Sequence, residues 1–413
     1  MCVARQPIFD RKQQVYAYEL LFRAGLGSSQ FDGAEAASAT TQVIANSVLA
    51  IGLESILCGK KAFLNFDRSL LQGNLHSILP RESTVMEVLE SVEADAEVLD
   101  ACRNLRASGY AIALDDFVSR PETEPLVDFA QLIKVDVLAT AKSEQTRLLR
   151  NYRRRGIAML AEKVETHEEY QWALGAGYDY FQGYFFARPV VVRGKQIPAV
   201  KVTCLELLRE VQRPELDFDS LEKLIEEDVS LSYQLLRYVN SAIFANRVEV
   251  HTIHGGLTML GEDGIRHWAV LATLPILAKD KPGELITLSL ERARFYEMLA
   301  KRAHVAGTRY AYLMGLFSLI DALIDLPLEE ALRQANAAPV ISQALLGTAG
   351  PADPFWRIHR LAGFYEAADW EGVSRLAGEF GISLGAIGAA YQESALWAQE
   401  VLHASPSKRL AKA

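Results

Sequence analysis

The stretch A-I-A-L-D-D-F, residues 111–117, is an apolar run that ends in two adjacent carboxylates, Asp115 and Asp116. A short continuous run of apolar residues is typical of a strand that is buried on both faces, as in a parallel sheet. Six further runs in the first half of the chain have the same character. They are V-A-R-Q-P-I-F (3–9), A-F-L-N-F (62–66), T-V-M-E-V-L-E (84–90), L-I-K-V-D (132–136), I-A-M-L-A-E-K-V (157–164) and Y-F-Q-G-Y-F-F (180–186).

Stretches of helical period separate these runs, with candidates at 34–50, 94–107, 141–155 and 167–176. Strands that alternate with helices pair in parallel, and this many strands within about 190 residues favour a closed α/β barrel over an open sheet. From about Ala199 onward the sequence is almost wholly helical in period. We therefore predict two domains, a TIM-like α/β barrel at 1–198 and an all-α helical domain at 199–413. The boundary falls near V-V-R-G-K-Q-I-P (191–198), where glycine and proline interrupt the pattern.

The composition is that of an ordinary globular protein. The 413 residues are 50% hydrophobic and 23% charged, which suffices for two buried cores. The net charge of −9 argues against general attraction to nucleic acid or to an anionic membrane surface. No apolar run reaches the ~18 residues that span a bilayer. The cysteines are scattered, with no C-x-x-C pair and no signal peptide before them, so we predict reduced thiols and a cytoplasmic location.

Polar side chains lie near the carboxyl ends of the predicted strands, which in a barrel gather at one mouth. A lone aspartate at such a position, for example Asp116, is explained equally well as a helix N-cap or a turn residue. A set of them on successive strands instead predicts one shared site. Carboxylate and amide oxygens suit Mg²⁺ or Mn²⁺, and two such ions ~4 Å apart can clamp a phosphodiester. The set comprises Asn65, Glu87, Asp115, Asp116, Lys134, Glu162 and Gln182.

Seven motifs follow one another along residues 1–190. They are Y-E-L-L-F-R (18–23), F-L-N-F (63–66), M-E-V-L-E (86–90), A-L-D-D-F (113–117), I-K-V-D (133–136), A-E-K-V-E-T (161–166) and Q-G-Y-F-F-A-R-P (182–189). In this order they resemble the EAL domains, which bind and hydrolyse the bacterial second messenger cyclic di-GMP. Y-E-L-L-F-R then stands where that family has E-A-L-L-R.

The resemblance implies a role for each polar residue. Lys134 would assist the nucleophilic water, and Arg23 would contact a phosphate of the ligand. Glu90 would brace the loop after D-D-F, and Gln182 would complete the floor of the pocket. The metal would be held by Glu19, Asn65, Glu87, Asp115 and Glu162, with help from Asp116.

The sequence departs from the EAL pattern beside the expected site. The loop after D-D-F typically continues G-T-G-Y-S-S in active members, but here it is V-S-R-P-E-T-E-P (118–125). Val118 and Pro121 resist the positive φ angles that glycines allow. Leu20 stands in place of the motif's alanine, and Lys163 stands where the family has glycine in E-G-V-E. Lys163 could compete for the carboxylate of Glu162 or extend outward. These changes predict altered metal geometry and weakened hydrolysis.

The second half resembles the HDOD domain, a helical signal-output module related to HD-type metal phosphohydrolases. The resemblance rests on I-E-E-D-V-S-L-S-Y-Q-L-L-R-Y-V-N-S-A-I-F (225–244), I-H-G-G-L-T-M-L-G-E-D-G-I-R-H-W (253–268) and A-Y-L-M-G-L-F-S-L-I-D-A-L (311–323). An HD enzyme needs adjacent histidine and aspartate after G-L-L, where this chain has Ser318 and Leu319. These residues cannot replace an imidazole and carboxylate as metal ligands, so we expect no metal in this domain.

Two functional hypotheses follow for the whole chain. The first, which the departures favour, is a cyclic di-GMP sensor or scaffold that has weak or no hydrolysis and is coupled to a non-catalytic HDOD output domain. The second is an active Mg²⁺- or Mn²⁺-dependent phosphodiesterase that produces linear pGpG. Coupling would run through the linker helix at 199–212, with a protein partner on the HDOD surface. An oligomer is compatible with either hypothesis, whereas direct nucleic-acid or membrane binding is not expected.

Overall fold

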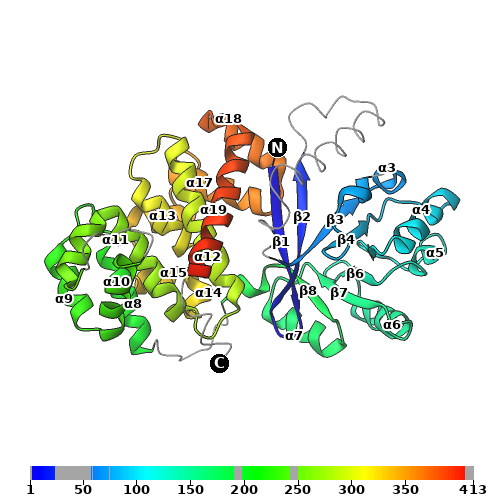
Figure 1. Ribbon diagram of the computed structural model, residues 1–413, viewed down its shortest axis with the longest axis horizontal. Coiled ribbons are helices and arrows are strands. Elements are labelled where there is room, and N and C mark those ends of the chain that lie inside the picture. The colour runs from blue at the N-terminus through cyan, green and yellow to red at the C-terminus, as the bar shows by residue number, and fades with distance from the viewer. Residues whose placement is uncertain are drawn as a thin grey trace. The chain divides into compact units, whose positions relative to one another are not determined.

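Eight strands form a closed barrel in the order β1 to β8 (Figure 1), which confirms the predicted α/β barrel. The computed structural model describes residues 2–23, 57, 59–73, 75–189, 198–241 and 250–404. The predicted helix at 34–50 and the predicted boundary at 191–197 lie outside these residues. The strands are β1 (Cys2–Asp10), β2 (Val15–Arg23), β3 (Lys61–Phe66), β4 (Thr84–Val88), β5 (Ala111–Leu114), β6 (Leu132–Asp136), β7 (Ala158–Glu162) and β8 (Tyr180–Gln182).

The first strand runs against the others, so the prediction of purely parallel pairing was wrong. β1 pairs antiparallel with β2 and with β8, while β2 to β8 pair in parallel. The strand Val15–Arg23 was also missing from the predicted strands. Only a short turn joins β1 to β2, with Gln13 at φ 57°, and a connection without a crossover helix forces antiparallel pairing.

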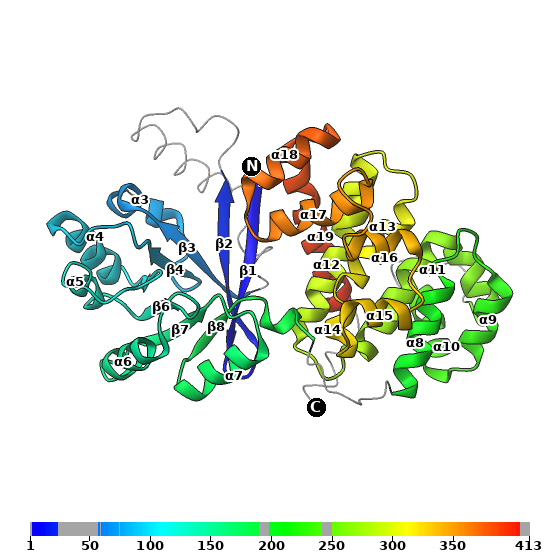
Figure 2. The ribbon, with the colours of Figure 1, turned by 180° about the vertical axis from the view of Figure 1, so that it is seen from behind.

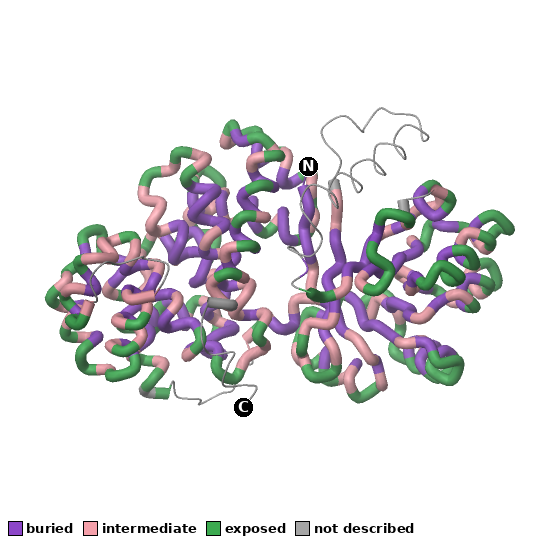
Figure 3. Tube along the Cα trace, in the orientation of Figure 1, coloured by how far each residue is buried: buried purple, intermediate pink, exposed green. Residues whose placement is uncertain are grey.

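A layer of apolar side chains fills the barrel, one from each of the first seven strands. Tyr180 of β8 packs against the layer. Because side chains of a strand alternate between its two faces, the residue two positions further along each strand also points inward. The layer consists of Ile8, Ala17, Phe63, Val85, Ala113, Leu132 and Leu160. In Figure 3 the buried segments follow the strands, and exposed segments are frequent on the surrounding helices.

Helices connect the parallel strands from β3 to β8; those at 96–107, 142–153 and 167–176 confirm predicted helices, whereas those at 68–72 and 124–127 were not predicted. α7 illustrates how the sequence sets their ends. Thr166 accepts a hydrogen bond from the backbone of Glu169, whose side chain accepts one from the backbone of Thr166. Gly177 ends the helix at φ 109°. The connecting helices are α3 (Arg68–Gln72), α4 (Ala96–Ala107), α5 (Glu124–Val127), α6 (Lys142–Arg153) and α7 (His167–Ala176), with 3₁₀ turns at Leu75–Ile78 and Tyr184–Ala187.

The remainder of the described chain is helical (Figure 2), which confirms the predicted fold class of the second half. α11 is interrupted by a non-helical residue, Gly261. No described helix combines the length and hydropathy needed to cross a membrane. The helices are α8 (Ala199–Glu210), α9 (Phe218–Glu226), α10 (Val229–Val239), α11 (Ile253–Leu277), α12 (Gly283–Arg302), α13 (Thr308–Phe317), α14 (Ile320–Ile324), α15 (Leu328–Gln334), α16 (Pro339–Leu345), α17 (Pro354–Glu366), α18 (Trp370–Phe380) and α19 (Leu384–Ala404).

The chain divides into two compact units whose limits differ from the predicted domains. The barrel unit comprises Met1–Arg188 together with Gly363–Ala413, and the helical unit comprises Pro189–Ala362. The last two helices therefore belong to the barrel unit, although their helical period placed them with residues 199–413 in the sequence-based prediction. α19 packs against β1, and Tyr365 donates a hydrogen bond of 3.1 Å to the carbonyl of Val3. Periodicity shows that a helix has a buried face, but it does not show what covers that face.

Gly315 is expected to be essential for the packing of α13 on α12. A Cβ atom at this position would overlap the carbonyl oxygen of Arg292 and the backbone of Ala293. We expect Gly315→Ala to destabilise the protein by about 1–3 kcal/mol, because the two helix backbones must separate. Urea unfolding measures this change. Gly283→Ala, at an open position at the start of α12, is the control and should leave stability unchanged or slightly raised. Equal midpoints for the two variants would contradict the prediction.

Candidate metal and ligand site in the barrel

A layer of polar side chains lies one pleat above the apolar layer, toward the mouth of the barrel. Seven members lie two residues from the apolar-layer residue of their strand, and Gln182 lies two residues from Tyr180. All lie within a strand except Asp115, which directly follows β5. The carboxyl ends of the parallel strands meet at this mouth, and β1 brings its member from the opposite chain direction. The members, which we call the polar layer, are Gln6, Glu19, Asn65, Glu87, Asp115, Lys134, Glu162 and Gln182.

Lys134 is the centre of the polar layer. Its ammonium group lies 2.5 Å from Glu162 Oε1, 3.1 Å from Asp115 Oδ1 and 3.4 Å from Glu19 Oε2, and it also pairs with Glu87. The side chain is 1% exposed. Burial alone would lower the pKa of Lys134, but the surrounding carboxylates raise it well above the usual value. Lys134 is therefore a fixed positive charge at neutral pH.

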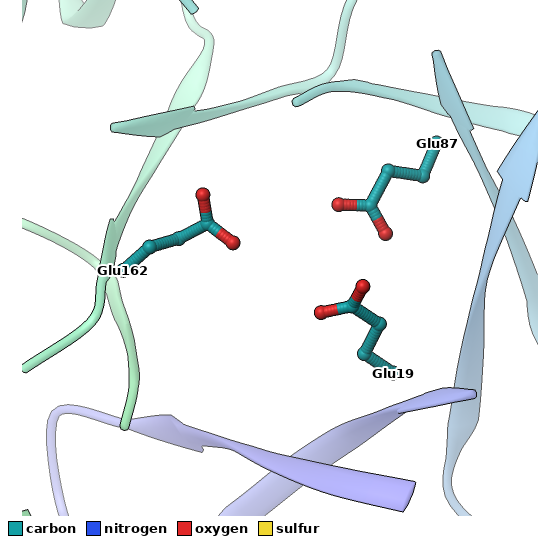
Figure 4. A group of neighbouring side chains, drawn as sticks. All are labelled: Glu19, Glu87 and Glu162. Atoms are coloured by element: carbon teal, nitrogen blue, oxygen red, sulfur yellow. The ribbon is translucent and has the colours of Figure 1, made fainter. Parts of the chain in front are cut away.

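Three glutamates converge on one small space (Figure 4), each from a different strand. One carboxylate oxygen of Glu19, of Glu87 and of Glu162 lies within 4.8 Å of the other two. Burial, and next the charge of Glu19, raises the pKa of Glu87 well above its usual value. Burial raises the pKa of Glu162 to about 8. The metal-free layer thus retains protons on carboxyl groups, because one ammonium cannot neutralise so many buried carboxylates.

Glu19 differs from the other two glutamates. Burial raises its pKa, but the charge of Lys134 and hydrogen bonds from Gln182 and Asn65 outweigh burial and lower the pKa below its usual value. Gln182 Nε2 donates to Glu19 Oε2 at 2.6 Å, and Asn65 Nδ2 donates to Glu19 Oε1 at 3.2 Å. Glu19 is thus held as a carboxylate in the absence of metal.

The donor atoms of the polar layer fit a hard divalent cation. Several of its buried oxygens have no hydrogen-bond partner, namely Asn65 Oδ1, Glu87 Oε2 and Gln182 Oε1. Asp116 Oδ1, immediately beside the layer, is also unpaired. Buried oxygens without partners are costly, and an oxygen-binding cation would satisfy them while it neutralises the excess of carboxylates. Asn65, Glu87 and Glu162 thus have the positions and chemistry that a metal would require.

Asp116 and Lys163 form a second polar group at the mouth. Lys163 Nζ lies 3.3 Å from Asp116 Oδ2 and 2.6 Å from Asp136 Oδ2. The hydrogen bond with Asp136 is the main reason that the pKa of Lys163 is raised. Lys163 thus reaches neither of the predicted positions, since it pairs with the two aspartates rather than with Glu162 or solvent alone. Its cation lies where it competes with any metal bound by Asp116.

Backbone strain accompanies this pair. Asp116 has φ 39° and Lys163 has φ 57°, both in the left-handed region that favours glycine. The family's glycine in E-G-V-E, replaced here by Lys163, thus corresponds to a real backbone requirement. Val118 does not adopt a positive φ. In the altered loop, Thr123 Oγ1 instead donates to the carbonyl of Val118 at 2.8 Å and accepts from the backbone of Arg120.

Besides Asp116, two predicted residues are not part of the polar layer. The side chain of Arg23 lies outside the described residues, although its backbone pairs with Cys2 at the end of β2. Glu90 is exposed and lines, together with Asp116 and Val118, a cavity of about 130 Å³ beside the loop. The predicted roles of these two residues in phosphate binding and loop support stay predictions.

The sequence analysis missed Gln6 and Asp136 as members of the site. Gln6 faces Glu19 directly across the β1–β2 pair, and Gln182 Nε2 donates to Gln6 Oε1 at 3.2 Å. Gln6 could not be predicted by the rule used for the parallel strands, in which the polar residue follows the apolar one. Because β1 is antiparallel, Gln6 lies before Ile8. Asp136 ends the run L-I-K-V-D, so its position at a strand end was a usable signal.

In the helical unit, the two residues that replace the HD pair are Ser318 and Leu319. Arg292 donates a hydrogen bond of 3.1 Å to Ser318 Oγ, and Ser318 donates one of 2.7 Å to the carbonyl of Gly315. Leu319 is buried. A hydroxyl engaged by an arginine and an apolar side chain provide no metal ligands at these two positions.

Comparison with known proteins assigns both halves. The model of the EAL domain matches residues 66–189, and that of the HDOD domain matches residues 197–337. Across 97% of its length the chain is 34% identical to the cyclic di-GMP phosphodiesterase CdgJ of Vibrio cholerae, of which it covers 92%. The chain belongs to the EAL–HDOD family. The matched EAL residues begin after Glu19, so this ligand candidate rests on the geometry of β2.

Two further proteins are similar to this chain. The EAL–HDOD chain is also 34% identical to the uncharacterized protein YuxH of Bacillus subtilis, over 91% of this chain and 93% of that protein. A crystal structure of a standalone EAL protein from Vibrio cholerae O395, in its c-di-GMP-bound form, is 25% identical over 45% of this chain and 91% of that chain. Its TM-score is 0.36.

Binding of Mn²⁺ to the EAL domain should release protons. Glu162, with a pKa of about 8, must lose its proton to become a ligand, and the raised pKa of Glu87 adds to this requirement. As pH falls from 8 to 6 we expect the affinity to fall about tenfold per pH unit for each proton released. Calorimetry in buffers of different ionisation enthalpy counts these protons. Glu162→Gln should bind more weakly with a shallower pH dependence, and binding without proton release would refute this account.

Proposed function

We propose that the EAL domain is a metal-dependent cyclic di-GMP phosphodiesterase with attenuated activity, and that the HDOD domain is its non-catalytic output module. The observation that carries the proposal is the convergence of Glu19, Glu87 and Glu162 beside unpaired buried oxygens. The relative that is 34% identical and bears the name cyclic di-GMP phosphodiesterase supports the substrate. Hydrolysis is here the first candidate function, whereas the sequence alone favoured a sensor or scaffold. The reason is that the three glutamates converge despite the altered loop.

The side chains of the polar layer would have distinct roles in hydrolysis. A bound Mg²⁺ or Mn²⁺ would supply Lewis acidity toward a phosphodiester oxygen and would lower the pKa of bound water. Lys134, whose pKa is raised by the carboxylates of the metal-free site, would act as a cationic hydrogen-bond donor to the attacking water or to a phosphate oxygen. Gln182 would fix the carboxylate of Glu19. Metal would be held by Glu19, Asn65, Glu87, Asp115 and Glu162.

A ligand sensor is the second candidate function, and the pairing of Lys163 favours it. The ammonium pairs with Asp116 Oδ2 and Asp136 Oδ2, so its positive charge would oppose a second cation bound through the unpaired Asp116 Oδ1. Loss of one of two metal ions would impair clamping of the attacking and leaving oxygens more than it impairs nucleotide binding. Binding without turnover is the behaviour that would identify a sensor.

The HDOD domain presents a surface suited to a protein partner. Val229 and Tyr233 are 83% and 63% exposed, and they lie one turn apart on α10. Exposed large apolar side chains of this kind support protein binding at α10. A protein partner of the HDOD domain, an oligomer and the cytoplasmic location stay predictions.

Turnover should depend on Glu87, near the end of β4, and not on Glu82, which precedes β4. Incubation of the pure protein with cyclic di-GMP and Mn²⁺, with separate measurement of linear product and bound ligand, tests this. We expect Glu87→Gln to lower turnover at least 100-fold, because it removes a ligand oxygen charge. Glu82→Gln, at an exposed position before β4, should leave turnover unchanged. Ligand binding by the unmodified protein without any product would reject the phosphodiesterase in favour of the sensor.

Removal of the Lys163 cation should raise turnover. We expect Lys163→Gly to increase kcat several-fold, because it frees Asp116 for metal and suits the positive φ. Stability should change by no more than about 1 kcal/mol, because the two lost ion pairs are partly exposed and the backbone strain is relieved. Lys163→Ala removes the charge but keeps a Cβ, so equal activation in both variants would assign the effect to charge. Unchanged or lower kcat in both variants would show that the cation does not restrain the site.

A further inference from the structure

Three consecutive hydrogen bonds join the polar layer to the C-terminal segment of the barrel unit. Gln182 Nε2 donates to Glu19 Oε2 at 2.6 Å and to Gln6 Oε1 at 3.2 Å. Gln6 Nε2 in turn donates to the backbone carbonyl of Glu366 at 3.4 Å. Glu366 is the last residue of α17, so the row of contacts leads from a proposed metal ligand to a helix end.

The chemistry of the last acceptor fixes the orientation of both amides. A backbone carbonyl can only accept, so the amide nitrogen of Gln6 must face Glu366. The oxygen of Gln6 then faces Gln182, which must present its own nitrogen to Gln6. The same nitrogen holds Glu19, and Gln182 Oε1 is left buried and unpaired. Glu19, which as a carboxylate can only accept, sets the same orientation of Gln182 from the other side, so the two end points together fix the order of both amides.

The C-terminal segment is attached firmly to the strand that carries Gln6. Tyr365 is fully buried and donates to the carbonyl of Val3, and Cys2 Sγ donates to the carbonyl of Leu384 at 3.3 Å. Val3 and Gln6 both belong to β1. Tyr184 also donates to the carbonyl of Glu366, at 3.2 Å. The position of the end of α17 is therefore tied to β1 both directly and through Gln6.

We propose that the end of α17 is a positioning element of the EAL site, which acts through Gln6 and Gln182 to hold Glu19 in its metal-binding geometry. The inference deepens the proposed function, because it rests on Glu19 as a metal ligand. Gln6 is a positioning residue in this account, since it reaches Glu19 through Gln182. α17 begins at Pro354, among the residues of the helical unit, so its last turn is a covalent route by which that unit influences the barrel.

The first experiment measures Mn²⁺ affinity of the full chain by calorimetry, without substrate. We expect Gln6→Met, which removes both hydrogen bonds of the Gln6 amide, to weaken binding about threefold to tenfold. Tyr365→Phe, which loosens the end of α17 from β1, should weaken binding by a smaller factor of about two to four. Tyr178→Phe is the matched control, because it removes a buried tyrosine hydrogen bond of the barrel unit, to Gln145, that involves neither β1 nor α17. It should change the affinity less than twofold.

The double variant, Gln6→Met with Tyr365→Phe, distinguishes an effect transmitted through Gln6 from general destabilisation of the protein. If Tyr365 acts through Gln6, the combined variant binds Mn²⁺ no more weakly than Gln6→Met alone. Independent, multiplying effects would overturn the proposal, as would wild-type affinity in Gln6→Met. Urea unfolding of each variant checks that the folded fraction is the same in all samples.

A second readout needs no metal, so that the failure of this proposal and of the proposed function are distinguishable. The side-chain amide signals of Gln182, identified by their loss in Gln182→Met, should exchange slowly with solvent in the metal-free wild type. We expect exchange at least fivefold faster in Gln6→Met and in Tyr365→Phe, and unchanged in Tyr178→Phe. Absence of Mn²⁺ binding by the wild type would contradict the proposed function alone. Equal exchange in wild type and Gln6→Met would overturn the positioning role.

Discussion

The structure depends on one electrostatic constraint, the burial of several carboxylates around a single ammonium inside the barrel. Removing an ion from water costs several kcal/mol unless a partner or a ligand compensates for it. Lys134 compensates in part, and protons on Glu87 and Glu162 reduce the remaining charge, as their raised pKa values indicate. Such a site can form without metal, and its excess of carboxylate charge would favour the binding of a metal ion. The unpaired oxygens at Asn65 and Glu87 are the geometric counterpart of the same imbalance.

The period of a β-strand accounts for most of what the sequence could predict. Because inward positions recur every two residues, each apolar-layer residue is followed by a polar-layer residue, as with Val85 and Glu87 or Leu132 and Lys134. The order of runs along the chain was therefore enough to predict a barrel and to bring its polar strand ends together. The rule failed at β1, since its antiparallel direction places the polar residue before the apolar one. Gln6 was missed for this reason, and so was the hairpin that creates it.

Features that depend on long-range packing could not be predicted. The left-handed backbone at Asp116 and the pairing of Lys163 with Asp136 arise where two loops meet at the mouth, and no local pattern encodes that meeting. The assignment of α19 to the barrel unit has the same origin. Its amphipathic period requires a partner surface, and both β1 and the helical unit could have supplied one. Only the three-dimensional contacts, such as that of Cys2 Sγ with the carbonyl of Leu384, decide between them.

The division of the chain changes where communication between the two domains is to be sought. The sequence placed it in the linker helix at 199–212, at the start of the predicted HDOD domain, on the assumption that the chain passes between the domains once. The compact units show two passages, at 188/189 and at 362/363, and the second lies within α17. A continuous helix transmits displacement along its axis more faithfully than a loop, and the last carbonyl of this one is the acceptor for Gln6. In a layer where one ammonium balances several carboxylates, a reoriented amide at Glu19 changes the electrostatic balance of the whole site. The coupling proposed above would need no large movement, because a small displacement of a single acceptor would act on the most highly charged point of the barrel.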